Sequence, residues 1–187
     1  MIGFFCSAVH PRLLRRPPIE REMEEKVGTM DQELIAEQIR LAHDGEAWHG
    51  AGLKGILTEV TAVQAASRPI PNAHSIWELV LHLTGWTREV TRRLEGAPAG
   101  VPSEGDWPPV GVVSPSNWDS AKRALADAHG ELARAVSRAS VERLAARVSG
   151  KGDAAETYRE MLHGLAQHDA YHGGQISLLK KAMTISP

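Results

Sequence analysis

The sequence predicts an all-α protein, a four-helix bundle with a long crossover loop between its second and third main helices. Apolar residues recur at the three- and four-residue spacing of amphipathic helices over several long segments. Capping residues, glycines and prolines bound these segments, and no segment alternates apolar and polar residues as half-buried strands do. The main helices are expected at residues 31–43, 75–94, 118–137 and 155–183.

The length and charge of the chain narrow the classes of function. Its 187 residues suffice for one domain with a substantial core. A net charge of -2 provides no long-range attraction to nucleic acid or to a membrane surface. No apolar run approaches the ~20 residues of a membrane span. A single cysteine, Cys6, cannot form an intrachain disulfide, which fits a cytoplasmic location.

Residues 1–29 differ in composition from the rest of the chain. Their prolines break helices, and their basic residues follow the apolar stretch instead of preceding it as in a secretory signal. Helical periodicity begins only after Met30, where Asp31 is a suitable N-cap. We therefore expect residues 1–29 to be a disordered extension or a mis-assigned start, and residues 30–183 to form the domain. The start of the protein is left open among Met1, Met23 and Met30.

The first expected helix, residues 31–43, has an apolar stripe that includes Ile35 and Ile39. Glycines around Trp48 then interrupt the helical pattern, which predicts a kink or a short break. A second helical stretch is expected at residues 53–66, before a loop that contains two prolines.

Capping signals mark the next helix, which is expected to open after Ser75. Glu78 lies three residues later and completes a capping box with Ser75. The helix is expected to end at Leu94 or Glu95. Residues 96–116 hold five prolines and four glycines, which predicts a long irregular connection.

The two remaining helices follow this connection. Asn117 is the expected N-cap of a helix over residues 118–137, in which Leu125 and Leu132 lie on one face. A short polar stretch with glycines separates this helix from the last one, which is expected at residues 155–183.

Three histidines lie on apolar helix faces and form a candidate metal site. His168 and His172 are four residues apart, so their side chains lie one turn apart on the same face of the last helix. His82 interrupts an apolar segment of the helix that follows Ser75. Three neutral imidazoles bind a divalent metal of borderline softness and leave a coordination position for water or substrate. The sequence therefore predicts one divalent metal ion, zinc or nickel, held by these three histidines.

The alternative for these histidines is a structural role, because a buried histidine is stable when both ring nitrogens are hydrogen-bonded. Gln175, close to His172 on the same face, is a candidate partner that would orient a ligand imidazole. Asp169 gives this helix a likeness to the zincin motif, but we expect it to be a solvated surface carboxylate. Among the other histidines, His163 lies ~140° from His168 around the helix and is not expected to share the site. Four more are expected to face the solvent, namely His10, His43, His74 and His129.

The segments that carry the three histidines resemble DinB-like (YfiT/DinB superfamily) proteins. Residues 74–86, HSIWELVLHLTGW, resemble the second-helix signature of that family. Residues 168–176, HDAYHGGQI, resemble its His-x-x-x-His-x-Gly-Gln ending. Residues 45–50, GEAWHG, are similar to a Trp-His-Gly element of one subgroup. The resemblance covers residues 31–181, which is the whole expected domain.

The resemblance implies a four-helix bundle, often dimeric, with one divalent metal held by three histidines. These ligands correspond to His82, His168 and His172. The resemblance also implies transfer or isomerisation reactions that use low-molecular-weight thiols, while other members are described only as stress-inducible. The expected function is therefore a metal-dependent enzyme, in the first place a thiol-dependent S-transferase. Its expected partners are a small-molecule substrate, a low-molecular-weight thiol and a second copy of the chain.

Two alternatives stay open beside the transferase, which would need a thiol cosubstrate because Cys6 lies outside the domain. A hydrolase that uses a metal-activated water would need a general base. Glu46 and His49 are the candidate catalytic residues for that role if the Trp48 segment folds over the cavity. A non-catalytic metal-binding stress-response bundle would need no free coordination position.

Overall fold

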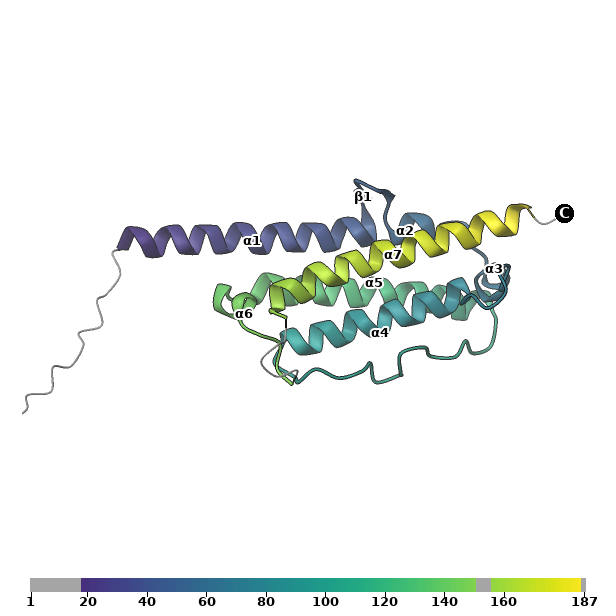
Figure 1. Cartoon of the computed structure of the whole chain (residues 1–187). Helices are drawn as coiled ribbons and strands as arrows, with labels where there is room; N and C mark the ends of the chain where they lie inside the picture. Colours follow the sequence, from purple (N-terminus) through teal and green to yellow (C-terminus); the bar gives the residue numbers. More distant parts are fainter. Residues whose placement is uncertain (1–17, 151–155, 186–187) are drawn as a thin grey trace, which may run out of the picture.

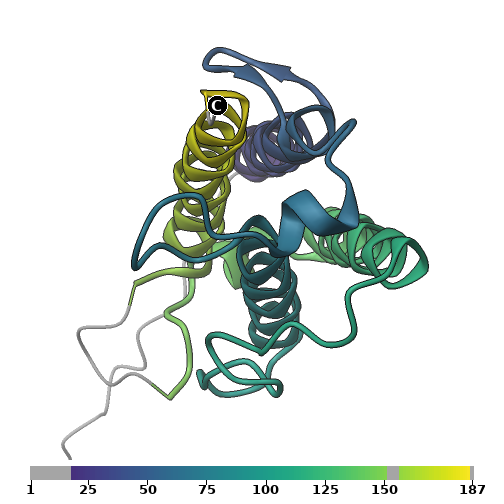
Figure 2. The same ribbon diagram turned by 90° about the vertical axis from the view of Figure 1, so that its right-hand side faces the viewer.

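Long helices dominate the computed structural model, which describes residues 18–150 and 156–185 (Figure 1). The long helices are α1 (Pro18–Asp44), α4 (Ile76–Leu94), α5 (Pro115–Arg138) and α7 (Tyr158–Ile185). They pack side by side, with α1 and α4 each in contact with both α5 and α7 (Figure 2). Helices α5 and α7 therefore lie diagonally opposite each other. The prediction of an all-α fold is confirmed.

Short elements connect the long helices. They are the antiparallel hairpin β1 (Glu46–Ala47) and β2 (Gly50–Ala51), in which Glu46 pairs with Ala51, and the helices α2 (Leu53–Ile56), α3 (Ala62–Ala66) and α6 (Val141–Ala145). The prediction of one helical stretch over residues 53–66 is wrong. Glu59 has a φ of 66°, which a continuing right-handed helix does not allow, and Thr61 then caps α3 with a capping box.

The predicted start of the first helix at Asp31 is wrong, because α1 runs through this position from Pro18. Proline is favoured in the first turn of a helix, where its missing N–H has no intrahelical partner to lose. Gly28 is buried against Val141 of α6, and Asp31 forms an ion pair with Arg159 of α7. Helix α1 thus covers residues 18–29 of the segment that was expected to be a disordered extension or a mis-assigned start, and residues 1–17 lie outside the described part of the chain.

The start of α4 agrees with the prediction and the start of α5 does not. The Ser75 hydroxyl accepts a hydrogen bond from the Glu78 N–H, and the Glu78 carboxylate accepts one from the Ser75 N–H, which is the predicted capping box. Helix α5 begins at Pro115, earlier than expected. Its N-cap is Ser114, whose hydroxyl accepts a hydrogen bond from the Asn117 N–H at 3.2 Å.

The buried core consists of two apolar clusters that follow one another along the bundle. On α7, Leu165 belongs to one cluster and Ile176 to the other. On α5, Leu132 belongs to the same cluster as Leu165, and Leu125 belongs to the same cluster as Ile176. His129 lies between Leu125 and Leu132. Polar side chains fill the junction, and we call them the polar layer: His43, His82, His129, His168, Asp169 and His172.

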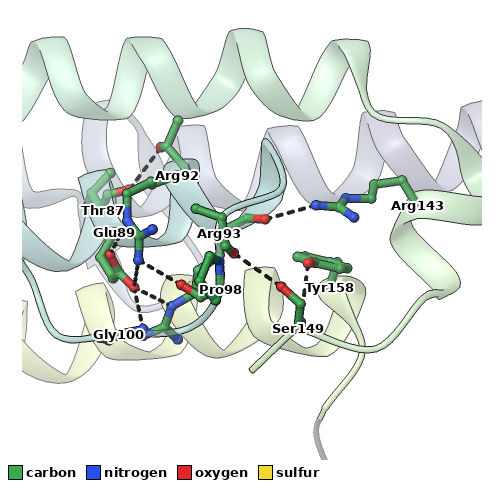
Figure 3. A network of polar contacts seen from close by, with 11 residues as sticks. Thr87, Glu89, Arg92, Arg93, Pro98, Gly100, Arg143, Ser149 and Tyr158 are labelled. Atoms are coloured by element: carbon green, nitrogen blue, oxygen red, sulfur yellow. Dashed lines mark hydrogen bonds and ion pairs between the residues drawn. The ribbon is translucent and has the colours of Figure 1, made fainter. Parts of the chain in front are cut away.

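The connection from α4 to α5, residues 95–114, is held against α4 by the buried carboxylate of Glu89 (Figure 3). Its Oε1 accepts hydrogen bonds from the Gly100 N–H at 2.9 Å and from Arg93 Nε at 2.7 Å. Arg93 also donates to the carbonyl of Gly100. The beginning of the connection is thereby fixed. None of the described helices combines the length and apolar composition that crossing a bilayer requires.

Candidate metal centre

Three histidine side chains from two neighbouring helices converge in the polar layer. His82 comes from α4, and His168 and His172 come from adjacent turns of α7. The Nε2 atom of His168 lies 3.0 Å from Nε2 of His82 and 3.0 Å from Nε2 of His172. One ring nitrogen from each residue lies within 4.8 Å of the others. The structure therefore brings together the three histidines that the sequence singles out as metal ligands.

The outer ring nitrogens of two of these histidines bind oxygen atoms. Nδ1 of His82 lies 2.7 Å from the carbonyl oxygen of Asp106, and Nδ1 of His172 lies 2.7 Å from Oε1 of Gln175. Because these oxygens only accept hydrogen bonds, each Nδ1 carries the proton and each Nε2 presents a lone pair to the centre. Gln175 thus lies where it was expected, as the partner of a candidate ligand.

The donor set fits a divalent metal ion. His168 Nε2 can carry at most one proton, so it cannot donate to the lone pairs of both neighbouring rings. A cation between the three nitrogens removes this conflict. Two ligands of a tetrahedral metal, each ~2.0 Å from the ion, are separated by about 3.3 Å, close to the 3.0 Å separations here.

Burial keeps two of the candidate ligands, His168 and His172, in the neutral form that binds metals. It lowers the pKa of His168 to about 4, and the nearby His172 and His82 add to the effect. Burial also lowers the pKa of His172, against an opposing contribution from the hydrogen bond to Gln175. At neutral pH these rings therefore need not lose a proton before they coordinate an ion.

Two residues of the connection between α4 and α5 complete one side of the centre. Trp107 stacks between His82 and His74, with ring centroids 4.0 Å and 3.6 Å away and interplanar angles of 9° and 3°. The Asp106 carboxylate accepts a hydrogen bond of 2.7 Å from the indole N–H of Trp86. Sequence analysis missed both residues, because no spacing relates a position in a proline-rich connection to a histidine on a helix.

A cavity of about 500 Å³ opens beside the centre and is lined by His82 and His168. A volume of this size accommodates a small-molecule ligand. Its other walls are formed by Trp86, Val90, Arg93, Asp106, Glu156, Glu160, Met161, Gly164 and Leu165. Arg93 is held by Glu89, so its charge is already compensated. The described residues also line a cavity of about 460 Å³ beside His43, which none of the three converging histidines reaches.

Glu46 and His49 do not lie at this cavity. Both are exposed on the β1–β2 hairpin, which lies beyond α1 on the side away from α4 (Figures 1 and 2). Trp48, in the same hairpin, is fully exposed and does not fold over the cavity. The arrangement that would make these residues general bases is therefore not formed.

Three side chains expected at the surface are buried in the polar layer. His129 Nε2 lies 2.9 Å from an oxygen of Asp169, and its Nδ1 lies 2.9 Å from the Leu125 carbonyl oxygen. His43 stacks on His129, with ring centroids 4.2 Å apart. Burial, together with the neighbouring His129, lowers the pKa of His43 to about 4. The burial of His43 and His129 could have been predicted from helical spacing. His43 lies four residues after the buried Ile39, and His129 lies four residues after the buried Leu125, so each shares a helix face with a core residue.

Comparison with known proteins agrees with this arrangement. A family model described as the DinB superfamily matches residues 47–176, which include the three converging histidines and the connection between α4 and α5. The chain belongs to the DinB superfamily. The resemblance found in the sequence is thereby confirmed. No curated protein and no solved structure matched this DinB superfamily chain.

Proposed function

We propose that this DinB superfamily protein binds one divalent metal ion through His82, His168 and His172 and uses it in a reaction on a small molecule. The cavity of about 500 Å³ that reaches two of these side chains carries the proposal. Structural metal sites are closed by a fourth protein ligand, whereas catalytic sites keep a position open. Among the described residues, no fourth histidine, cysteine or carboxylate joins the cluster.

The reaction proposed in the first place is transfer to a low-molecular-weight thiol. A divalent metal supplies Lewis acidity, which lowers the pKa of a bound thiol. With such an ion bound, the thiol would give its proton to water, its sulfur would bond to an electrophilic carbon of the substrate, and the leaving group would depart with the electron pair of the broken bond. The apolar side chains of Trp86, Met161 and Leu165 bind the body of the substrate and exclude water. No cysteine lies among the described residues, so the thiol is a cosubstrate.

The second candidate is a hydrolase in which the metal activates water. Two of the three carboxylates that line the cavity, those of Asp106 and Glu160, favour it as general bases in place of Glu46 and His49. Hydrogen bonds from the backbone N–H and hydroxyl of Thr157 lower the pKa of Glu160, so this group is ionised at neutral pH.

Elemental analysis of protein purified without a tag or chelator tests metal binding. The wild type is expected to hold about one equivalent of metal, and His82→Ala, His168→Ala and His172→Ala are expected to hold much less. His163→Ala is the matched control, because His163 also lies on α7 but binds Gln38 through Nδ1 at 2.8 Å. Undiminished metal in the His168→Ala protein would refute the site.

Titration of the cobalt(II)-loaded protein with cysteine or 2-mercaptoethanol tests the thiol. A sulfur-to-cobalt charge-transfer band is expected if a thiol binds at the open position. A visible spectrum that changes with pH but not with thiol would favour the hydrolase. A spectrum unchanged by both would indicate a closed, non-catalytic site.

A further inference from the structure

A buried hydrogen bond crosses the diagonal of the helix bundle. It joins His129 of α5 to Asp169 of α7, helices that lie on opposite corners (Figure 2). The distance between Nε2 and Oδ2 is 2.9 Å, and the side chains are 4% and 0% exposed. His43 from α1 stacks on the His129 ring and restricts its rotation. Three of the long helices are thus fixed relative to one another at this level of the bundle.

The bond acts on the helix that carries two candidate ligands. Asp169 directly follows His168 and precedes His172 by three residues. Successive residues are rotated by ~100° around a helix, so holding Asp169 toward α5 sets the direction in which His168 and His172 point toward α4. Rotation of α7 that breaks the bond also moves both imidazoles.

His168 depends on this constraint more than the other two histidines do. The Nδ1 atoms of His82 and His172 are held by Asp106 and Gln175. The buried Nδ1 of His168 has no hydrogen-bond partner within the described ranges. Its ring is therefore placed by the α7 backbone and by the imidazoles of His82 and His172, each 3.0 Å from its Nε2.

The arrangement does not serve stability alone. Both ring nitrogens of His129 lie 2.9 Å from an oxygen atom, that of the Leu125 carbonyl on one side and that of the Asp169 carboxylate on the other. The second oxygen of Asp169 is buried without a hydrogen-bond partner in the described part of the chain, which is destabilising. A buried polar pair of this kind can often be replaced by apolar residues without loss of stability.

We propose that His129 and Asp169 are positioning residues that orient His168 and His172 for metal binding. The proposal rests on the metal site proposed above. Neither residue coordinates the ion, and both act through the rotation of α7. The expected consequence of removing the bond is weaker metal binding by a protein that remains folded.

Zinc affinity, measured by competition with a chromophoric chelator, tests the proposal. Asp169→Ala is expected to weaken zinc binding by roughly 10- to 100-fold, as for other residues that orient metal ligands. Asp169→Asn is expected to retain most of the affinity, because its amide can donate to His129 Nε2. The control is Leu132→Ala, which removes a buried side chain of α5 from an apolar cluster and is expected to lower thermal stability without weakening zinc binding.

The double variant His129→Leu/Asp169→Ala separates positioning from stability. It is expected to fold, because both polar partners are removed together, and still to bind zinc weakly. It also decides the question if Asp169→Ala alone does not fold. Wild-type affinity in the double variant, or equal losses in Asp169→Ala and Leu132→Ala, would overturn the positioning role alone. A wild-type protein that binds no zinc would overturn the proposed function as well.

Discussion

Replacement of Glu89 by glutamine tests how firmly the α4–α5 connection is held. Burial alone would raise the pKa of Glu89, but hydrogen bonds from Arg92, Arg93 and the Gly100 N–H outweigh it and lower the pKa to about 2. The ordinary value is 4.5, and each pKa unit corresponds to about 1.4 kcal/mol. The ionised carboxylate thus contributes about 3 kcal/mol to the free energy of unfolding at neutral pH. Glu89→Gln is expected to remove most of this contribution and to leave the buried Arg93 without its anionic partner.

The sign of the pH dependence follows from the lowered pKa. The contribution of Glu89 is complete above pH 4.5 and is lost as the pH falls toward 2. The difference in unfolding free energy between wild type and Glu89→Gln should therefore shrink from about 3 kcal/mol at pH 7 to about 1 kcal/mol at pH 3. The buried histidines titrate in both proteins, so this difference isolates Glu89.

Urea unfolding followed by circular dichroism at pH 7 and pH 3 measures this difference. Glu95→Gln is the matched control, because Glu95 also lies at the end of α4 but pairs with Arg138 at the surface, at 3.4 Å. The control is expected to change stability by less than about 1 kcal/mol at either pH. A Glu89→Gln difference that stays constant between the two pH values would refute the reasoning.

Three further predictions concern other parts of the molecule. Burial lowers the pKa of His43 from 6.5 to about 4, so the free energy of unfolding of the wild type falls as the pH drops through this range. In urea titrations, His43→Phe should therefore lose up to about 3 kcal/mol less of its unfolding free energy between pH 7 and pH 4 than the wild type does. A chain that starts at Met30 lacks Gly28, which packs on Val141, and should melt at a lower temperature than one that starts at Pro18; equal calorimetric transitions would contradict this. Light scattering should give twice the chain mass, because α1 exposes a stripe of apolar side chains that a second copy would cover, and the mass of one chain at every concentration would exclude a dimer. The stripe consists of Ile19, Met23, Met30 and Leu34.

The candidate metal ligands could be predicted because their signal is local. His168 and His172 are one helical turn apart, and His82 interrupts an apolar stripe, so each pattern lies within a single helix. The capping box of Ser75 and Glu78 is local in the same sense.

Residues brought to the centre by irregular backbone could not be predicted. Trp107 stacks on His82 because Glu89 and Gly100 fix the start of a connection whose path no periodicity encodes. Asp169 was misjudged for a different reason. No residue near Asp169 in the sequence marks it as buried, so the sequence predicts a solvent-facing side chain. The partner that makes its burial tolerable, His129, lies on a helix at the opposite corner of the bundle.

The polar layer separates the interior of the bundle into two apolar clusters. Each cluster can protect its own backbone amides, so the two ends of the bundle can behave as separate cooperative units in native-state hydrogen exchange. The polar layer is the junction between these units. A metal ion held there by His82, His168 and His172 would join α4 to α7, and would therefore raise the free energy of every partial opening that separates these two helices.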